Sequence, residues 1–254
     1  MGMYPESPLF LPAGKKAGCL YRTTGYGKVF APMAERVKIA TRAEIRERIN
    51  PALSNRRYIP HIFDQNGDNS CAAEETALAI ATTQVRQGGP FVLLNPLSMY
   101  AFTSGGRNAG SSILDNWAFA RDRGCLPEAV WPRSKGWNAK APQELWDRFG
   151  VHFRLGEVYD AGSALEVATA LTEQCVVGFG YDIGRDGHSC LLDHLLDEDT
   201  AEFANSWDET WDDEGFGRIK LRSINFGYGA LAARTATICP GHILEEIAAY
   251  ANAG

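Results

Sequence analysis

Residues 205–219 read NSWDETWDDEGFGRI, and no other segment says more about the architecture of this 254-residue chain. Their first residue, Asn205, follows a histidine, His188, at a distance of 17 residues. Far upstream, Gln65 stands six residues before Cys71, so the chain presents Gln, Cys, His and Asn in that order. A thiol, an imidazole and a carboxamide that orients the imidazole are side chains suited to nucleophilic attack on a carbonyl group.

A helix is predicted to begin at about Cys71. Small and apolar residues recur at helical spacing up to Gln87, Asn69 or Ser70 is suited to cap the helix, and a Gly-Gly-Pro sequence at 88–90 ends it. A thiol attacks only as thiolate, and the free N–H groups at a helix N-terminus lower the pKa of a cysteine. Because acidic residues nearby oppose that shift, the site also requires a cationic partner.

His188 opens an apolar run that predicts a strand, which would hold its ring at the edge of a sheet. Asn205 ends the next predicted strand, where its carbonyl oxygen can accept from one ring nitrogen and aim the other at sulfur. His194 is the rival base, but it lies inside an apolar run, which favours a core or strand position. Each histidine alone favours a structural role, whereas the ordered set favours a catalytic one.

Helices precede strands along this chain. Ser-initiated capping patterns predict helices at 112–124 and 163–173, and a further capping box at 41–44 predicts a short helix. The later part reads as extended runs at 175–181, 188–196, 201–206, 216–221 and 231–239. This order predicts an α+β protein of two lobes.

Several segments resemble the papain-like cysteine peptidases. The nucleophile segment of that family is similar to 64–71, and its Gln also stands six residues before its Cys. Further similarity lies at 106–111, which is like the Gly-rich substrate loop, and at 124–132, 187–189 and 205–207. The resemblance implies a papain-like two-lobe fold with an active-site cleft between a helical lobe at about 61–160 and an antiparallel β lobe at about 161–240.

The same resemblance implies a role for each matching side chain. Cys71 would be the nucleophile, His188 the general base and then acid, and Asn205 the group that orients His188. Gln65 would donate an N–H to the oxyanion, together with the backbone of Cys71. Trp207 would shield the His–Asn hydrogen bond from water and line the substrate site.

The substrate loop implies Asn108, Ala109 and Gly110 as substrate-binding residues, although Ala109 stands where the family has a Gly. Asp68 and Arg107 stand where the family commonly has disulfide-forming cysteines. Missing disulfides favour an intracellular or phage-type relative. The resemblance implies no metal and no organic cofactor, and a peptide or protein as the substrate.

The charge of the chain is unevenly distributed. Residues 1–60 carry eleven Lys or Arg and four Asp or Glu, whereas residues 61–254 carry 14 and 27. We predict a basic N-terminal extension at 1–45 before a peptidase domain at 46–254. Such an arm can dock on its own body, on a neighbouring subunit or on nucleic acid, and a solvated leader fits equally well. A protein partner or self-association is favoured over nucleic acid.

No run of about 18 apolar residues and no secretory signal is found, so we expect a soluble protein, cytoplasmic or virion-associated, without membrane contact. The six cysteines are scattered without a Cys-x-x-Cys pair, which favours reduced thiols. Ten acidic residues and no basic one lie between 189 and 217, and they favour a solvated surface over a cation site.

Two functions remain open at this point. The first is a cysteine peptidase that hydrolyses peptide or amide bonds through a Cys-His-Asn triad and an acyl-enzyme. The second is a non-catalytic structural or assembly protein of the same fold, for example a phage virion component, whose basic leader binds neighbours.

Overall fold

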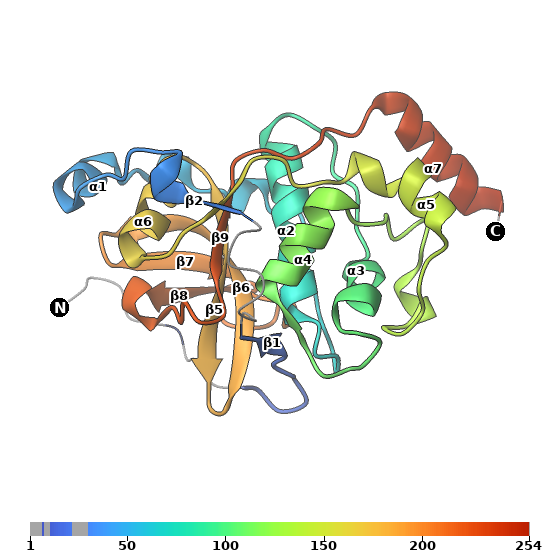
Figure 1. Ribbon diagram of the computed structural model, residues 1–254, viewed down its shortest axis with the longest axis horizontal. Coiled ribbons are helices and arrows are strands. Elements are labelled where there is room, and N and C mark those ends of the chain that lie inside the picture. Colours follow the sequence, from blue (N-terminus) through green and yellow to red (C-terminus); the bar gives the residue numbers. More distant parts are fainter. Residues whose placement is uncertain (1–6, 8–10, 22–29, 254) are drawn as a thin grey trace.

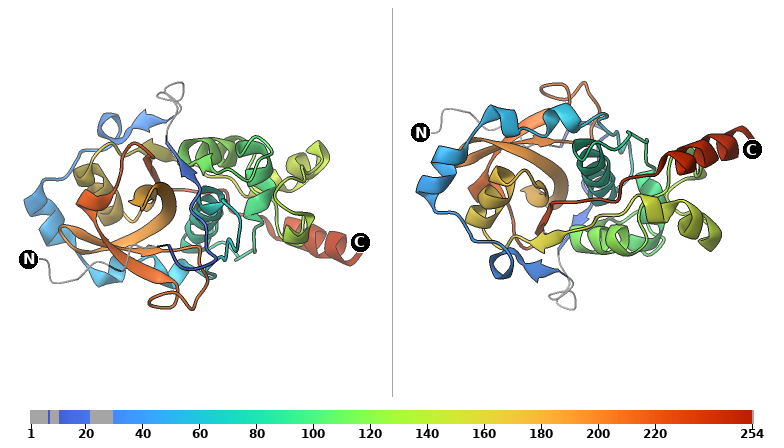
Figure 2. Two further views of the ribbon diagram at one scale, coloured as in Figure 1. Left: turned by 90° about the horizontal axis from the view of Figure 1, so that it is seen from below. Right: turned by 90° about the horizontal axis from the view of Figure 1, so that it is seen from above.

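The computed structural model describes residue 7, residues 11–21 and residues 30–253. Two parts lie side by side, one made mainly of helices and one built around a sheet (Figure 1). The helical lobe contains α2 (Cys71–Arg86), α3 (Pro96–Thr103), α4 (Ile113–Asp122), α5 (Gln143–Arg148) and α7 (Gly241–Ala253). The last helix, α7, lies at the end of this lobe that is far from the sheet (Figures 1 and 2).

The central helix, α2, stands between the sheet and the other helices in both views of Figure 2. Every residue from Cys71 to Gln84 is buried, as expected of a helix that is surrounded on all sides. Its many alanines allow β6 and α4 to approach it closely. The N-terminal end of α2 is thereby fixed against the β lobe.

In the described part of the chain, nine strands form one sheet: β1 (Cys19–Leu20), β2 (Ala31–Pro32), β3 (Ser111–Ser112), β4 (Val158–Asp160), β5 (Val176–Ile183), β6 (Asp186–Asp197), β7 (Thr200–Ala204), β8 (Phe216–Lys220) and β9 (Ala230–Ala233). The main path runs β2-β4-β9-β5-β6-β1-β3, and β7 joins β6 to β8. The long strands of the β lobe pair antiparallel, while β1–β3 and β2–β4 are parallel. On one side of the sheet lie α1 (Arg42–Arg48) and α6 (Ala164–Thr172).

The first 45 residues are partly built into this sheet. Strand β1 pairs with both β3 and β6, and β2 pairs with β4. The remaining parts of the predicted extension, at 1–6, 8–10 and 22–29, lie outside the described residues. In the described part of the chain, β1 and β2 thus belong to the same sheet as the strands of the predicted peptidase domain.

Each lobe has its own apolar core. The helical lobe packs large side chains such as Trp117, Trp146 and Phe149, and the β lobe packs Phe179 and Phe203. Cys71 belongs to the first cluster and Trp207 to the second. The seam between the two cores therefore passes the residues that the sequence marks as candidates.

The predicted helices at 71–87, 112–124 and 163–173 correspond to α2, α4 and α6, and the capping box at Thr41 and Glu44 is present in α1. The predicted strands correspond to β5 to β9, although β9 ends six residues earlier than predicted. Helices α3, α5 and α7 and strands β1 to β4 were not predicted. Within the described residues, no helix is both long enough and apolar enough to cross a membrane.

Candidate active site

Cys71 is the first residue of α2 and is completely buried. Ser70 holds the N-cap position, but its hydroxyl donates to the Glu74 carboxylate at 3.0 Å instead of capping the helix. The buried Glu74 is paired with Arg133, with 2.5 Å between Oε1 and Nη2. This guanidinium supplies a cation close to the helix start and balances an acid that would oppose a thiolate.

A second acid on α2, Glu75, is buried one turn after Cys71. Both of its oxygens accept from the indole N–H of Trp117, at 3.1 and 3.0 Å. Burial nevertheless raises the pKa of Glu75 to about 8. Glu75 is therefore mostly uncharged at pH 7, and it adds little negative charge beneath the thiol.

His188 lies near the start of β6, and its Nε2 is 2.8 Å from Asn205 Oδ1. Trp207 stacks on the imidazole, with 4.4 Å between ring centroids and 18° between planes, and Tyr181 meets it edge-on. Both the ring and the carboxamide are buried. The other ring nitrogen, Nδ1, has no hydrogen-bond partner among the described residues.

The thiol of Cys71 reaches the β lobe. Its Sγ accepts from the backbone N–H of Gly18 at 3.4 Å, and the backbone N–H of Ser189 also bonds to it. Ser189 is the neighbour of His188 in the chain, so the thiol lies against the part of β6 that carries the imidazole. No hydrogen bond joins Cys71 to His188 in the described part of the chain.

Burial keeps both groups uncharged in this arrangement. It raises the pKa of the Cys71 thiol to about 11, and the three backbone N–H groups around the sulfur only partly oppose it. It also lowers the pKa of His188 to about 4, although the hydrogen bond to Asn205 acts in the other direction. The lowered thiol pKa that the helix position predicts is therefore not found in this state.

The N-terminal segment 15–21, which we call the covering segment, contributes to the burial of the thiol, because its Gly18 N–H contacts the sulfur. Cys19 pairs with Ser111 on one side and with Gly187 on the other. Ser111 N also donates to Gly18 O at 3.0 Å, and Tyr21 stacks on an aromatic ring of the β lobe. The segment lies at the seam between the lobes, where β1 is labelled in Figure 1, and its Gly18 N–H contacts the thiol.

Gln65 is buried and bonded to the β lobe. Its Oε1 accepts from the Ser206 hydroxyl at 2.8 Å, and its backbone N–H donates to Ser206 O at 3.0 Å. Its Nε2 donates to Asp68 O at 2.7 Å. An amide nitrogen carries two protons, so one N–H of Gln65 remains for another acceptor.

The predicted substrate residues lie beside the covering segment. Asn108 is held by the Asn69 backbone N–H, which donates to its Oδ1 at 2.8 Å, while Ala109 is exposed. Gly110 has a φ of 97°, and a Cβ there would lie 2.2 Å from Gly18 O. The site therefore requires a glycine at 110, because the backbone of another segment approaches it so closely.

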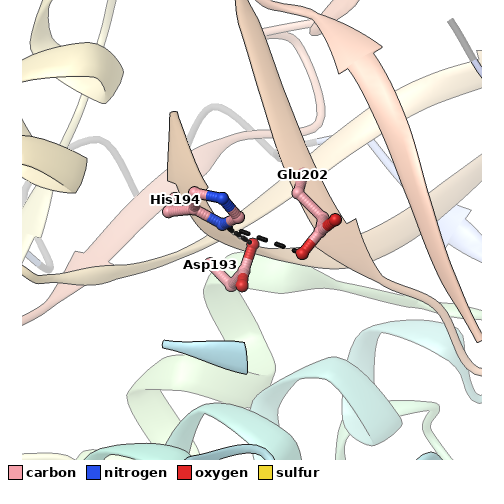
Figure 3. Close-up of side chains that lie close together, drawn as sticks. All are labelled: Asp193, His194 and Glu202. Carbon is pink, nitrogen blue, oxygen red and sulfur yellow. Dashed lines mark hydrogen bonds and ion pairs between the residues drawn. The ribbon is translucent and has the colours of Figure 1, made fainter. Parts of the chain in front are cut away.

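The rival base, His194, lies on the same strand in a separate cluster with Asp193 and Glu202 (Figure 3). Its Nδ1 is 2.9 Å from Asp193 Oδ1 and 3.8 Å from Glu202 Oε1. A register shift between β6 and β7 at this point allows consecutive residues to share one side of the strand. Six residues of strand, or about 20 Å, separate His194 from His188.

The cluster offers the ligand types of a divalent cation, but Arg56 already pairs with one of its carboxylates. Arg56 places a guanidinium nitrogen 3.3 Å from Glu202 Oε2 and pairs with Asp213 at 2.7 Å. Burial lowers the pKa of His194, yet the hydrogen bond and charge of Asp193 raise it overall. The raised pKa of His194 thus favours the protonated form of the imidazole beside the buried Asp193.

Sequence reasoning missed the residues that cover the thiol. Gly18 is 53 residues from Cys71, and Lys15 binds Asp64 and Asp208, which are 49 and 193 residues away from it. No periodicity or motif marks these pairs. The only available signal was the excess of basic residues before position 60.

No protein-family model and no curated protein matches this sequence. Among solved structures, xylellain, a cysteine protease from Xylella fastidiosa, is similar with a TM-score of 0.57 at 17% identity, over 69% of this chain and 82% of its own. A procathepsin B from Trypanosoma congolense gives 0.60 at 14% identity, over 87% and 86%. A digestive procathepsin L 3 of Tenebrio molitor larval midgut gives 0.56 at 16% identity, over 69% and 66%.

These identities are low, so the similarity establishes the fold and leaves the activity to be argued from the site. The resemblance seen in the sequence is confirmed at that level, as is the α+β architecture of a helical lobe beside a β lobe. This chain has the fold of the papain-like cysteine proteases.

Proposed function

We propose that this protein is a cysteine peptidase that hydrolyses peptide or amide bonds with Cys71 as the nucleophile. The observation that carries the proposal is the buried His188, which is bonded to Asn205 through one nitrogen and has no partner at the other. A buried ring nitrogen without a hydrogen bond destabilises the fold, and such an atom calls for a functional explanation. Accepting the proton of the nearby thiol is such a task.

The reaction proceeds in two halves. His188 takes the proton of Cys71 while sulfur bonds to the substrate carbonyl carbon, and the resulting C–N bond cleavage sends that proton to the departing amine. Water then attacks the thioester and gives a proton to His188. Release of the carboxylic acid returns the proton to sulfur, so no cofactor is consumed.

The remaining residues position this chemistry. Asn205 holds the imidazole in one tautomer, and the stacked ring of Trp207 keeps water from their hydrogen bond. The second N–H of Gln65 and the backbone N–H of Cys71 stabilise the oxyanion. The segment at Asn108 to Gly110 binds the main chain of the substrate.

Turnover requires the covering segment to move, because Cys71 has no exposed surface. Loss of the segment exposes the thiol to water, which removes the main cause of its raised pKa. The helix N-terminus and the neutralised Glu74 then favour the thiolate. The covered state described above is therefore the resting state of the peptidase.

The same burial favours a second candidate, a non-catalytic structural or assembly protein of this fold. A thiol with a pKa of about 11 and no exposed surface is unreactive as it stands. In that case the covering segment is a permanent part of the fold. The two candidate functions differ in whether the covering segment ever moves away from Cys71.

Turnover of casein and of a peptide library by four full-length proteins tests the choice. We expect Lys15→Met to cleave faster than the native chain, because Lys15 anchors the covering segment. Adding Cys71→Ala should abolish cleavage, whereas adding Cys239→Ala, at an equally buried but distant thiol, should not. Four folded proteins that cleave nothing would leave only the structural role.

A further inference from the structure

An open groove of about 580 Å³ lies between the lobes beside the candidate active site. Its walls include Phe63 and Leu93 and several carboxylates, among them Asp64, Asp208 and Glu209. Asp64 and Asp208 directly adjoin Gln65 and Trp207 in sequence. The groove therefore begins at the residues assigned to the oxyanion and to the shielding of His188.

One amine already binds at the edge of this groove. The Nζ atom of Lys15 is 2.8 Å from Asp64 Oδ1 and 2.9 Å from Asp208 Oδ2. Its side chain is only 18% exposed. Lys15 stands three residues before Gly18, whose N–H donates to the Cys71 thiol. A side chain of the covering segment is thus held by two carboxylates at a fixed distance from the sulfur.

The two carboxylates are held in place by the backbone. Asp64 forms an antiparallel bridge with Trp207, and the Asp208 N–H donates to Phe63 O at 3.1 Å. The Asn66 N–H donates to Asp64 Oδ1 at 2.8 Å, and the Thr210 N–H donates to Asp208 Oδ1 at 2.7 Å. The spacing of the pair therefore does not depend on Lys15.

The surroundings favour a cation. Glu209 and Glu128 also line the groove, and its one guanidinium, that of Arg133, is paired with the buried Glu74. Partial enclosure strengthens charge-assisted hydrogen bonds between an ammonium or guanidinium and carboxylates. A neutral side chain at this point would leave the two carboxylates without a cationic partner.

We propose that Asp64 and Asp208 form a binding site for a lysine or arginine side chain of the substrate, and that Lys15 occupies this site in the covered state. Lys15 stands three residues before Gly18, which binds the Cys71 thiol, so the site lies within a few residues of chain length of the sulfur. That the bound side chain belongs to a substrate rests on the proposed function. Binding at the site can be measured without catalysis.

Binding is tested first, on the full-length Cys71→Ala protein with Lys15→Met, which empties the site and retains an apolar stem. The probes are two pentapeptides, Gly-Gly-Arg-Gly-Gly and the same peptide with citrulline, a neutral analogue of similar shape. We expect calorimetry to show about tenfold tighter binding of the arginine peptide. Restoring Lys15 should weaken binding of both peptides, because it anchors the covering segment, and should weaken binding of the arginine peptide more, because it also occupies the site.

The carboxylates are then removed in turn in that protein. Asp208→Asn and Asp64→Asn should each reduce the preference for arginine over citrulline, and the double variant should abolish it. Glu245→Gln, at an exposed acid on α7, is the matched control and should keep the preference. Equal binding of the two peptides, or a preference that survives the double variant, would overturn the proposal. Circular dichroism verifies that each variant is folded.

Cleavage provides the second arm. A neutral peptide with one lysine moved through successive positions should be cleaved about tenfold faster with lysine at one position, relative to norleucine there. The double Asp variant should lose that gain and still cleave the norleucine peptide. If no peptide is cleaved while arginine binding is retained, the proposed function fails and the site stands.

Discussion

Strand β6 carries one histidine near each end, and the two lie in opposite electrostatic surroundings. His188 is enclosed by aromatic rings and a neutral carboxamide, and its pKa is lowered to about 4. His194 faces Asp193 and Glu202, and its pKa is raised. The pKa of a histidine on this strand is thus lowered at one end and raised at the other, according to what the neighbouring elements place beside the ring.

The largest expected difference between the two ends is in turnover. His188→Ala should reduce kcat/KM by roughly ten thousandfold, because the thiol then lacks its proton acceptor. His194→Ala should leave turnover unchanged when both proteins are compared in the Lys15→Met background. Steady-state kinetics on one peptide measure both values, and a large loss from His194→Ala would reverse the assignment of the base.

The two histidines should also give stability opposite pH dependences. For His188, the unfolded chain takes up a proton near pH 6.5 while the folded chain resists until about pH 4, so stability falls as the pH drops across this window. The loss is roughly 3 kcal/mol. Urea unfolding at several pH values measures the free energy of unfolding of the native protein and of His188→Gln. This loss of stability towards acid pH should appear in the native protein and be absent from the variant.

Next in size is the effect of the group that orients the imidazole. Asn205→Ala removes the acceptor at 2.8 Å from His188 Nε2 and frees the ring to rotate. We expect kcat to fall by about a hundredfold with little change in KM. Asn252→Ala, at an exposed amide on α7, serves as the control. A change confined to KM would show that Asn205 acts on substrate binding instead.

The smallest effect belongs to the other end of β6. His194→Gln should cost about 1–2 kcal/mol of unfolding free energy, since a charged hydrogen bond to a buried carboxylate is lost. A raised pKa means that His194 stabilises the fold fully below pH 6.5 and less as the pH rises through its folded value. Unfolding curves above pH 6.5 should therefore converge for the native and variant proteins. If the stabilities of the two proteins instead stay equally far apart as the pH rises, the His194–Asp193 ion pair is not the source of the difference.

Local chemistry in the sequence predicted much of this structure. The helix at Cys71 and the strand bearing His188 follow from spacing, glycine stops and apolar runs, and Asn205 follows from its place after the next strand. The His188–Asn205 pairing could be predicted because 17 residues separate them across one strand connection. Within the described residues, these elements lie where the patterns indicate.

Other features depend on partners far away in the chain. Strand β1 has two residues and no periodicity, and it exists only because Ser111 and Gly187 supply neighbours on both sides. The raised pKa of Cys71 follows from that contact, so a rule about helix termini alone predicts the wrong direction. Helix α7 has an apolar face that is buried only because it packs against the folded helical lobe.

If the protein is the proposed peptidase, the covering segment also has a kinetic consequence, since it is tethered to the site that it covers. A tethered competitor is present at an effective concentration of millimolar order, whatever the concentration of the protein. A free substrate can bind only during the fraction of time in which the competitor is detached, and its apparent dissociation constant is the intrinsic one divided by that fraction. Dilution cannot activate such a molecule, whereas any partner that captures the detached N-terminus would do so.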